Sequence, residues 1–201
     1  QQKWARELIK KISLKGTETV LDLGCGDGKV TAEISKMISR GSIIGVDNSA
    51  GMIKLATDRH PSVTYPNLSF QEMDAGNLNF SDHFDLIFSN AVLHWVKDQK
   101  PVIKGMFKSL KQGGRVLLQM GGKGNADGIV EVLSELQTEK KWSSYFNEFK
   151  FPFFFPGIKE YKLLLLDCGF KLNRIELIPK KKDHSGIGDL KGWIRTTWLP
   201  Y

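Results

Sequence analysis

The sequence has little of what marks membrane, disulfide-linked or repetitive proteins. It contains two cysteines, Cys25 and Cys168, and no apolar run approaches the ~18 residues that suggest a membrane span. It has no internal repeat and no low-complexity tract. Its 201 residues are 41% hydrophobic and 25% charged, which is the balance of a globular protein long enough to bury its own core. With so few cysteines and no visible signal peptide, a cytoplasmic location is expected.

Positive charge exceeds negative charge. Lys and Arg total 29 and Asp and Glu total 22, so the formal net charge is +7. A basic protein favours acidic partners such as RNA, anionic lipid or an anionic metabolite. The lysines are scattered, however, and form a run only at Lys180–Lys182, so a solvated lysine-rich surface is an equal alternative. We expect neither a nucleic acid nor a membrane to be the main partner.

The two ends of the sequence differ from the usual ends of a natural chain. It begins at Gln1 without an initiator Met, and it stops at Tyr201 just after an aromatic amphipathic segment. We therefore expect this sequence to be a piece of a longer protein.

Strand and helix patterns alternate along the first 120 residues. The strands are short apolar runs, and the helices carry apolar residues at helical spacing. Strands are predicted at 19–23, 42–46, 68–72, 84–88 and 115–120, with helices at 4–12, 29–39, 50–59 and 101–110. This alternation predicts an α/β fold with a doubly wound, mostly parallel, Rossmann-like sheet. Ligands bind such sheets at the carboxyl ends of the strands.

The pattern loosens after residue 120. A glycine-rich loop is predicted at 121–128, helices at 129–140, 158–167 and 188–198, and a sixth strand at 171–178. Aromatic residues crowd the segment 142–155. We expect a single domain over 1–201, in which 121–160 is a helical and aromatic insertion or a lid over the substrate site. Packing of these aromatics within the insertion itself is an equal alternative.

The strongest chemical signal is the segment Asp22-Leu-Gly-Cys-Gly-Asp-Gly28 at the end of the first strand. Its glycines let the backbone approach a ligand. The dinucleotide fingerprint is not met, since the third glycine comes one position early, and no phosphate-binding P-loop is present. The acids Asp22 and Asp27 favour a ligand with a positive amine or sulfonium over an anion. Asp47 follows Gly28 at the spacing of an acid that accepts ribose hydroxyls, although it could instead cap the helix that starts near Ser49.

These residues resemble the class I S-adenosylmethionine-dependent methyltransferases. The resemblance implies a sheet that ends in a sixth and a seventh strand, the seventh lying beyond this chain. It implies S-adenosylmethionine as the cofactor and S-adenosylhomocysteine as the product, and no metal is expected. Gly24 and the backbone near Asn90 would hold the methionine part, and Asp47 the ribose. The cofactor-binding residues implied are Asp22, Gly24, Cys25, Gly26, Asp47, Asn48, Met52, Asp74, Ala75 and Asn90.

The segment Ser89-Asn-Ala-Val-Leu-His-Trp-Val96 is similar to one in trans-aconitate and juvenile hormone acid methyltransferases. Both enzymes methylate carboxylates, which implies a small-molecule acceptor and O-methylation of a carboxylate. A carboxylate is ionised at neutral pH and needs no general base. A hydroxyl or phenol acceptor would need one, and His94 is then the catalytic candidate. The alternative for His94 is a packing or hydrogen-bonding residue.

Aromatic side chains and one arginine are the candidates for the acceptor pocket. A guanidinium can bind a carboxylate through two parallel hydrogen bonds, which suits Arg195 as an anchor. Core packing of the aromatics and a plain surface arginine are the alternatives. The candidates are Trp95, Trp142, Tyr145, Phe154 and Arg195.

Two other functions are compatible with the sequence. The net positive charge permits an RNA methyltransferase, whose binding would weaken steeply with salt. A module that binds S-adenosylmethionine without catalysis would have the same glycine loop. The motifs typical of adenine amino methylation and of cytosine C5 methylation are absent.

Overall fold

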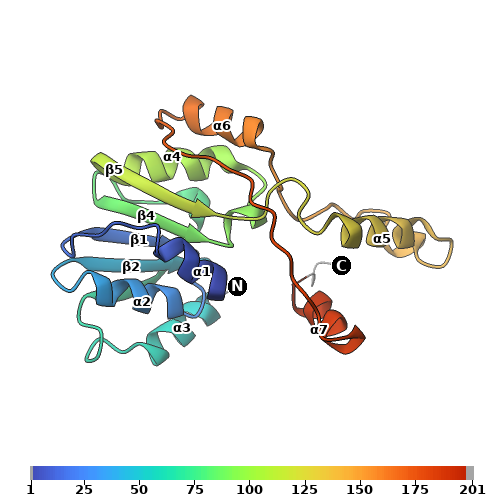
Figure 1. Ribbon diagram of the computed structural model, residues 1–201, viewed down its shortest axis with the longest axis horizontal. Helices are drawn as coiled ribbons and strands as arrows, with labels where there is room; N and C mark the ends of the chain where they lie inside the picture. The colour runs from blue at the N-terminus through green and yellow to red at the C-terminus, as the bar shows by residue number, and fades with distance from the viewer. Residues whose placement is uncertain (1, 198–201) are drawn as a thin grey trace. The chain divides into compact units, whose positions relative to one another are not determined.

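The computed structural model of the chain describes residues 2–197. Five strands form one sheet in the order β3-β2-β1-β4-β5, and every neighbouring pair is parallel (Figure 1). The strands are β1 (Thr19–Leu23), β2 (Ser42–Asp47), β3 (Leu68–Glu72), β4 (Phe84–Asn90) and β5 (Leu110–Gln119). The predicted doubly wound, parallel α/β fold is confirmed.

The described residues also contain seven α-helices and three short 3-10 helices. The α-helices are α1 (Gln2–Ile9), α2 (Lys29–Met37), α3 (Ala50–Arg59), α4 (Gln99–Ser109), α5 (Asp127–Thr138), α6 (Ile158–Asp167) and α7 (Ile187–Thr197). The 3-10 helices are η1 (Ala75–Asn77), η2 (Leu93–Trp95) and η3 (Ser143–Tyr145). All the predicted helices exist, and the last residue predicted for the final helix, Trp198, lies outside the described residues.

Several predicted boundaries are shifted by a few residues. The first helix was expected to reach Ile12 but α1 ends at Ile9, after which the backbone tightens into i to i+3 hydrogen bonds. The fourth long helix begins at Gln99 rather than Pro101, because Asp98 caps it by accepting a hydrogen bond from the Lys100 N–H. Strand β5 starts at Leu110, and a register shift separates that residue from the regular pairing that resumes at Arg115.

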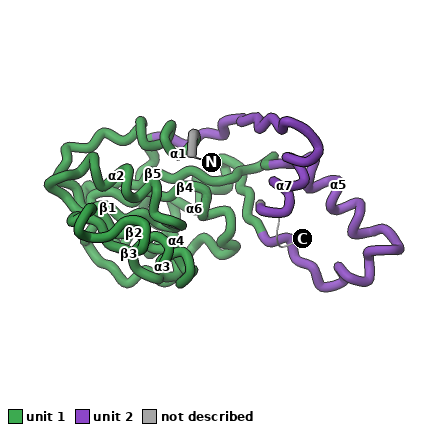
Figure 2. Tube along the Cα trace, turned by 90° about the horizontal axis from the view of Figure 1, so that it is seen from below, with its two compact units in different colours: residues 1–125, 153–173 green, residues 126–152, 174–201 purple. Residues whose placement is uncertain are grey.

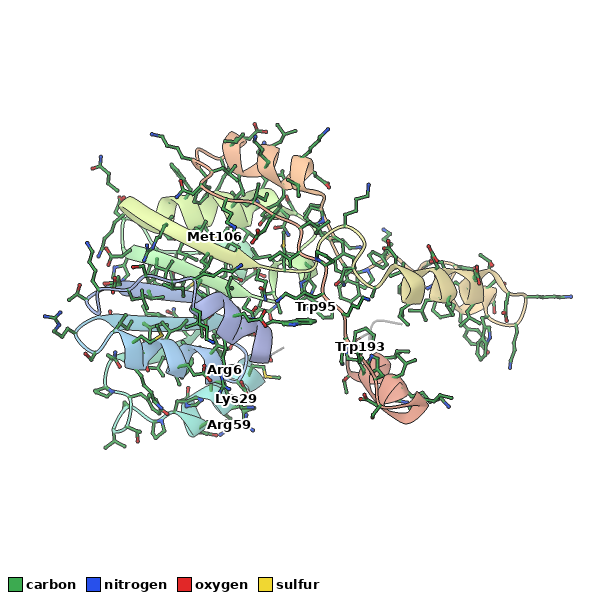
Figure 3. The ribbon with its side chains drawn as sticks, viewed as in Figure 1. Arg6, Lys29, Arg59, Trp95, Met106 and Trp193 are labelled. Carbon is green, nitrogen blue, oxygen red and sulfur yellow. The ribbon has the colours of Figure 1, made fainter. Side chains whose placement is uncertain are left out.

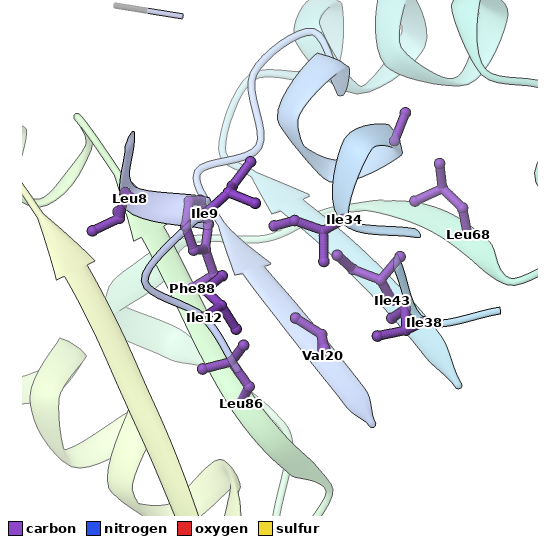
Figure 4. Packing of buried hydrophobic residues seen from close by; sticks show 11 residues of the cluster. Leu8, Ile9, Ile12, Val20, Ile34, Ile38, Ile43, Leu68, Leu86 and Phe88 are labelled. Atoms are coloured by element: carbon purple, nitrogen blue, oxygen red, sulfur yellow. The ribbon is translucent and has the colours of Figure 1, made fainter. Parts of the chain in front are cut away.

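The connections across the sheet run in opposite directions from β1. The units β1-α2-β2 and β2-α3-β3 move toward one edge and β4-α4-β5 toward the other, so right-handed crossovers place α2 and α4 on opposite faces (Figure 1). Figure 4 shows the apolar cluster that packs α1 and α2 against the sheet. Its buried members include Leu8, Ile9, Ile12, Val20, Ile34, Ile38, Ile43, Leu86 and Phe88.

The predicted sixth strand is wrong. Residues 171–178 contain no strand. A strand exists only where its backbone groups pair with a neighbour, and within residues 2–197 the sheet ends at β5. Leu177 and Ile178 are exposed as a result.

The chain divides into two compact units (Figure 2). Unit 1 comprises residues 1–125 and 153–173 and contains the sheet; unit 2 comprises 126–152 and 174–201 and contains α5, η3 and α7. The expected insertion or lid at 121–160 stays a prediction. None of the helices within residues 2–197 is both long and apolar enough to cross a membrane.

Candidate cofactor and acceptor site

Three glycines shape the turn from β1 into α2. Gly24, Gly26 and Gly28 have φ angles of 78°, 54° and 76°, in the left-handed region that side chains rarely adopt. A Cβ on Gly24 would lie 2.2 Å from Cγ2 of Val92, whereas a Cβ on Gly26 would meet no atom within 4 Å. The loop is therefore packed tightly at Gly24 and open at Gly26, where a ligand can approach the backbone.

The end of β2 is joined to this loop by hydrogen bonds. The Val46 carbonyl accepts the N–H groups of Gly24 (2.7 Å) and Cys25 (2.9 Å). Asp47 accepts the Gly26 N–H at Oδ2 and the Ser49 N–H at Oδ1, both at 3.0 Å. A carboxylate has about four acceptor sites, so Asp47 keeps room for two hydroxyl groups. The geometry of Asp47 is therefore compatible with both expectations, which are local capping and binding of ribose hydroxyls.

The two acids that flank the loop differ in their surroundings. Asp22 is 2% exposed and accepts a 2.6 Å hydrogen bond from the Thr31 hydroxyl, and burial raises its pKa to about 7. Asp27 forms ion pairs with Lys29 (2.8 Å) and Arg59 (2.6 Å), two residues labelled in Figure 3. Partial burial opposes ionisation of Asp27, but its hydrogen bonds with Lys29 and the neighbouring positive charges lower its pKa. Asp22 thus ties β1 to α2, and cations of the protein itself neutralise Asp27.

Cys25 contributes no reactive thiol. Its side chain is buried, and burial raises the pKa of the thiol above its ordinary value. The interpretation of Cys25 as a small residue of the loop fits these surroundings.

The residues expected near the adenine follow β2 and β3. Asn48 and Met52 are exposed at the start of α3, where Ser49 caps the helix by accepting the Met52 N–H at 3.3 Å. Asp74 caps η1 and accepts the Gly76 N–H at 2.5 Å, with Ala75 half-buried beside it. A hydrogen bond from the N–H of the preceding residue, Met73, to the Asp47 carbonyl joins the two strand ends. The structure therefore places these candidates on adjacent loops.

His94 lies in η2, directly after β4. Its Nδ1 accepts the Gly121 N–H at 3.3 Å, and burial lowers its pKa to about 4. The ring is therefore neutral near pH 7, with its proton on Nε2. A neutral imidazole of this tautomer can donate a hydrogen bond from Nε2, but it has no free nitrogen to accept a proton.

An aromatic cluster surrounds His94 within unit 1. The ring centroids of Trp95 and Phe153 are 4.5 Å apart, those of Phe153 and Phe155 are 5.3 Å apart with the rings stacked, and His94 lies 5.9 Å from Phe155. Trp95, labelled in Figure 3, is 45% exposed. The Phe154 N–H donates to the His94 carbonyl at 2.7 Å. Two of the predicted pocket residues, Trp95 and Phe154, thus adjoin His94.

The other three pocket candidates belong to unit 2. Tyr145 is 79% exposed, and its ring centroid lies 6.4 Å from that of Trp142, which also has Lys141 Nζ over its face at 4.6 Å. Arg195 is exposed on α7. Their roles stay predictions from the sequence.

Two glutamines were missed by the sequence analysis. Gln99 is buried and donates from Nε2 to the carbonyls of Leu93 and Val96, at either end of η2. Gln119 bonds to Asn90 at the end of β4. No sequence pattern marks either residue, because a glutamine at a helix start or strand end has no characteristic spacing. Phe153 and Phe155 could have been predicted, because they belong to the aromatic run from which Phe154 was chosen.

Known proteins are similar to this chain in sequence and in fold. A family model described as "Methyltransferase domain" matches residues 14–181. An uncharacterized methyltransferase of Schizosaccharomyces pombe is 32% identical over 202 residues, covering 96% of this chain and 74% of the relative. Trans-aconitate 2-methyltransferase of Enterobacter sp. (strain 638) is 32% identical over 198 residues, covering 97% and 73%.

The solved structures that resemble this chain have lower sequence identity. Phosphoethanolamine N-methyltransferase 2 of Haemonchus contortus, in complex with S-adenosyl-L-methionine, aligns with a TM-score of 0.68 and 21% identity. The alignment covers 84% of this chain and 36% of that chain. The YcgJ protein of Bacillus subtilis aligns with a TM-score of 0.65 and 23% identity, covering 84% and 68%. At this level of sequence identity, the structural similarities show that the fold is shared.

Proposed function

The chain belongs to the class I S-adenosylmethionine-dependent methyltransferases, and from that premise we propose that it methylates a carboxylate oxygen of a small molecule. S-adenosylmethionine, when bound, supplies a methyl group on a positively charged sulfur, which a nucleophilic oxygen can accept by in-line displacement. The open backbone at Gly26 and the unused acceptor sites of Asp47 fit this cofactor. We assign the ribose to Asp47, the methionine part to Gly24 and the backbone at Asn90, and the adenine side to Asn48, Met52, Asp74 and Ala75.

The observation that carries the choice of a carboxylate is the state of His94. Its Nδ1 accepts the Gly121 N–H and its pKa is lowered to about 4, so neither ring nitrogen is available to accept a proton from a hydroxyl. An ionised carboxylate needs no base; it must be aligned and freed of water. A neutral His94 with its proton on Nε2 can help by donating a hydrogen bond. The relatives named trans-aconitate 2-methyltransferase support the same acceptor class.

The half-exposed Trp95 offers an apolar wall for the rest of such an acceptor. The pocket roles of Phe154, Trp142, Tyr145 and Arg195, and the role of 121–160 as a lid, belong to the proposal and rest on the sequence. Loss of turnover in Trp142→Ala and Phe154→Ala would support the lid, and a raised substrate constant with unchanged cofactor binding in Arg195→Lys would support the anchor. A cytoplasmic location is also proposed, on the strength of two buried, unbridged cysteines.

The test is to label products with methyl-labelled S-adenosylmethionine in a metabolite extract, using the full-length protein. Treatment with mild base then releases methanol from a methyl ester. Labelled methanol supports carboxylate methylation, and His94→Gln should keep most of that activity. Base-stable label overturns the carboxylate and indicates nitrogen, carbon or an ether oxygen. Cofactor binding without label in any fraction, RNA included, favours the non-catalytic alternative.

A further inference from the structure

Gln119 makes two contacts with the turn that follows β4. It is the last residue of β5 and the register partner of Asn90, the last residue of β4. Its backbone carbonyl accepts the Ala91 N–H at 2.7 Å, and its side-chain amide bonds to the Asn90 amide at 2.9 Å. One residue therefore holds the turn through both its backbone and its side chain.

Ala91, which Gln119 holds in this way, has an unfavourable backbone conformation. Ala91 has φ of 61°, in the left-handed region where a non-glycine residue is strained. Such a conformation persists only where the surrounding contacts determine it. The bonds from Gln119 to Asn90 and Ala91 are contacts of this kind, since they fix the residues on both sides of the Asn90–Ala91 peptide.

The same turn packs against the glycine loop. The Val92 side chain occupies the space that a Cβ on Gly24 would need, with its Cγ1 2.5 Å from that position. The Ser89 hydroxyl donates to the Leu23 carbonyl at 2.8 Å, on the other side of Asn90. A change in the path of residues 90–92 would therefore displace Val92 from Gly24 and disturb the loop that we assign to the cofactor.

We propose that Gln119 is a positioning residue for the cofactor site: its amide holds the Asn90–Val92 turn against the glycine loop. The inference rests on the cofactor site of the proposed function, and Gln119 itself needs no contact with the cofactor. It is distinct from a general role in strand stability, because the amide bond joins the two strands only at their ends.

The test uses S-adenosylhomocysteine as the probe in titration calorimetry. Gln119→Met keeps the length of the side chain and removes its hydrogen bonds, and we expect the dissociation constant to rise about 5- to 20-fold. Gln112→Met is the matched control, since Gln112 is an exposed residue of the same strand. Thermal unfolding of each variant establishes that it is folded. Gln119→Asn, whose amide is one methylene too short for the same bond, should weaken binding as well.

A second substitution separates positioning from stability. Ala91→Gly removes the penalty for the left-handed conformation, so adding it to Gln119→Met should restore part of the lost affinity. A Gln119→Met variant that binds within twofold of the unmodified chain would overturn the proposal. So would an equal loss in Gln112→Met, or a double variant with no recovery. If the unmodified chain fails to bind S-adenosylhomocysteine, the assigned cofactor site is wrong, which is a separate result.

Discussion

Helices α2 and α5 have similar sequence patterns and different surroundings. Both carry apolar residues at helical spacing, but α2 buries Thr31, Ala32, Ile34 and Ser35, whereas α5 buries no residue. Helix α2 lies on the sheet of unit 1, and α5 has η3 as its main neighbour within unit 2. The apolar period therefore predicts a helix in both units, whereas burial depends on whether a sheet is present to cover that helix.

The two units should differ in local stability for the same reason. Segments with few buried apolar side chains open at a lower free-energy cost than a packed core. In unit 2, Val132 and Leu136 are exposed on the helix that should supply its core. In unit 1, Phe84, Phe88 and Ile87 are fully buried on one strand. Substitutions of equal chemistry should therefore have unequal effects in the two units.

The largest difference is expected for truncation of a buried aromatic. Phe88→Ala removes a fully buried ring from β4, an interior strand of the sheet, and should lower the free energy of unfolding by ~3–5 kcal/mol. Leu136→Ala in α5 should cost less than ~1 kcal/mol, because its side chain is already exposed. Denaturant unfolding followed by circular dichroism measures both values. Equal losses would show that α5 is as well packed as the sheet and would contradict the expected difference between the two units.

Substitution of one glycine in each unit should affect ligand binding in unit 1 and helix stability in unit 2. Gly24→Ala must adopt a φ of 78° and place its Cβ within the Val92 side chain, so affinity for S-adenosylhomocysteine should fall ~100-fold or more. Gly192 lies inside α7 with no atom near its missing Cβ, so Gly192→Ala should stabilise the helix by ~0.5–1 kcal/mol. Calorimetric binding and thermal unfolding of the two variants provide the measurements. Undiminished binding by Gly24→Ala would refute the assignment of the loop.

The sequence was most informative where local rules decide the structure. The glycine loop, the cap at Ser49 and the five strands could be predicted because turn chemistry and apolar runs act over a few residues. The predicted strand at 171–178 was wrong because strand formation depends on a partner edge, which the local pattern does not encode. Gln119 was missed for a related reason: its partner Asn90 is set by the register of β4 and β5.

The remaining predictions concern pH, and the effects should have opposite signs in the two units. Burial raises the pKa of Asp22 from 3.8 to about 7, so the folded protein binds this proton more tightly than the unfolded chain. The stabilisation is present below pH ~4 and is lost as the pH rises toward 7, by at most ~1.4 kcal/mol per pH unit. Relative to Asp22→Asn, the unmodified chain should therefore lose stability across this range, as measured by urea unfolding at several pH values.

Asp189 in unit 2 should respond in the other direction. It accepts the Ser185 N–H at 3.1 Å and lies 3.2 Å from His184, and these hydrogen bonds and charges lower its pKa. A lowered pKa means that its contribution is present above the unfolded pKa and is lost as the pH falls. Because Asp189 is exposed, the loss should appear only as local opening of α7, in hydrogen exchange, and should be absent from Asp189→Asn. If the stability of Asp22→Asn changes with pH as that of the unmodified chain does, the pKa of Asp22 is the same in the folded and the unfolded state.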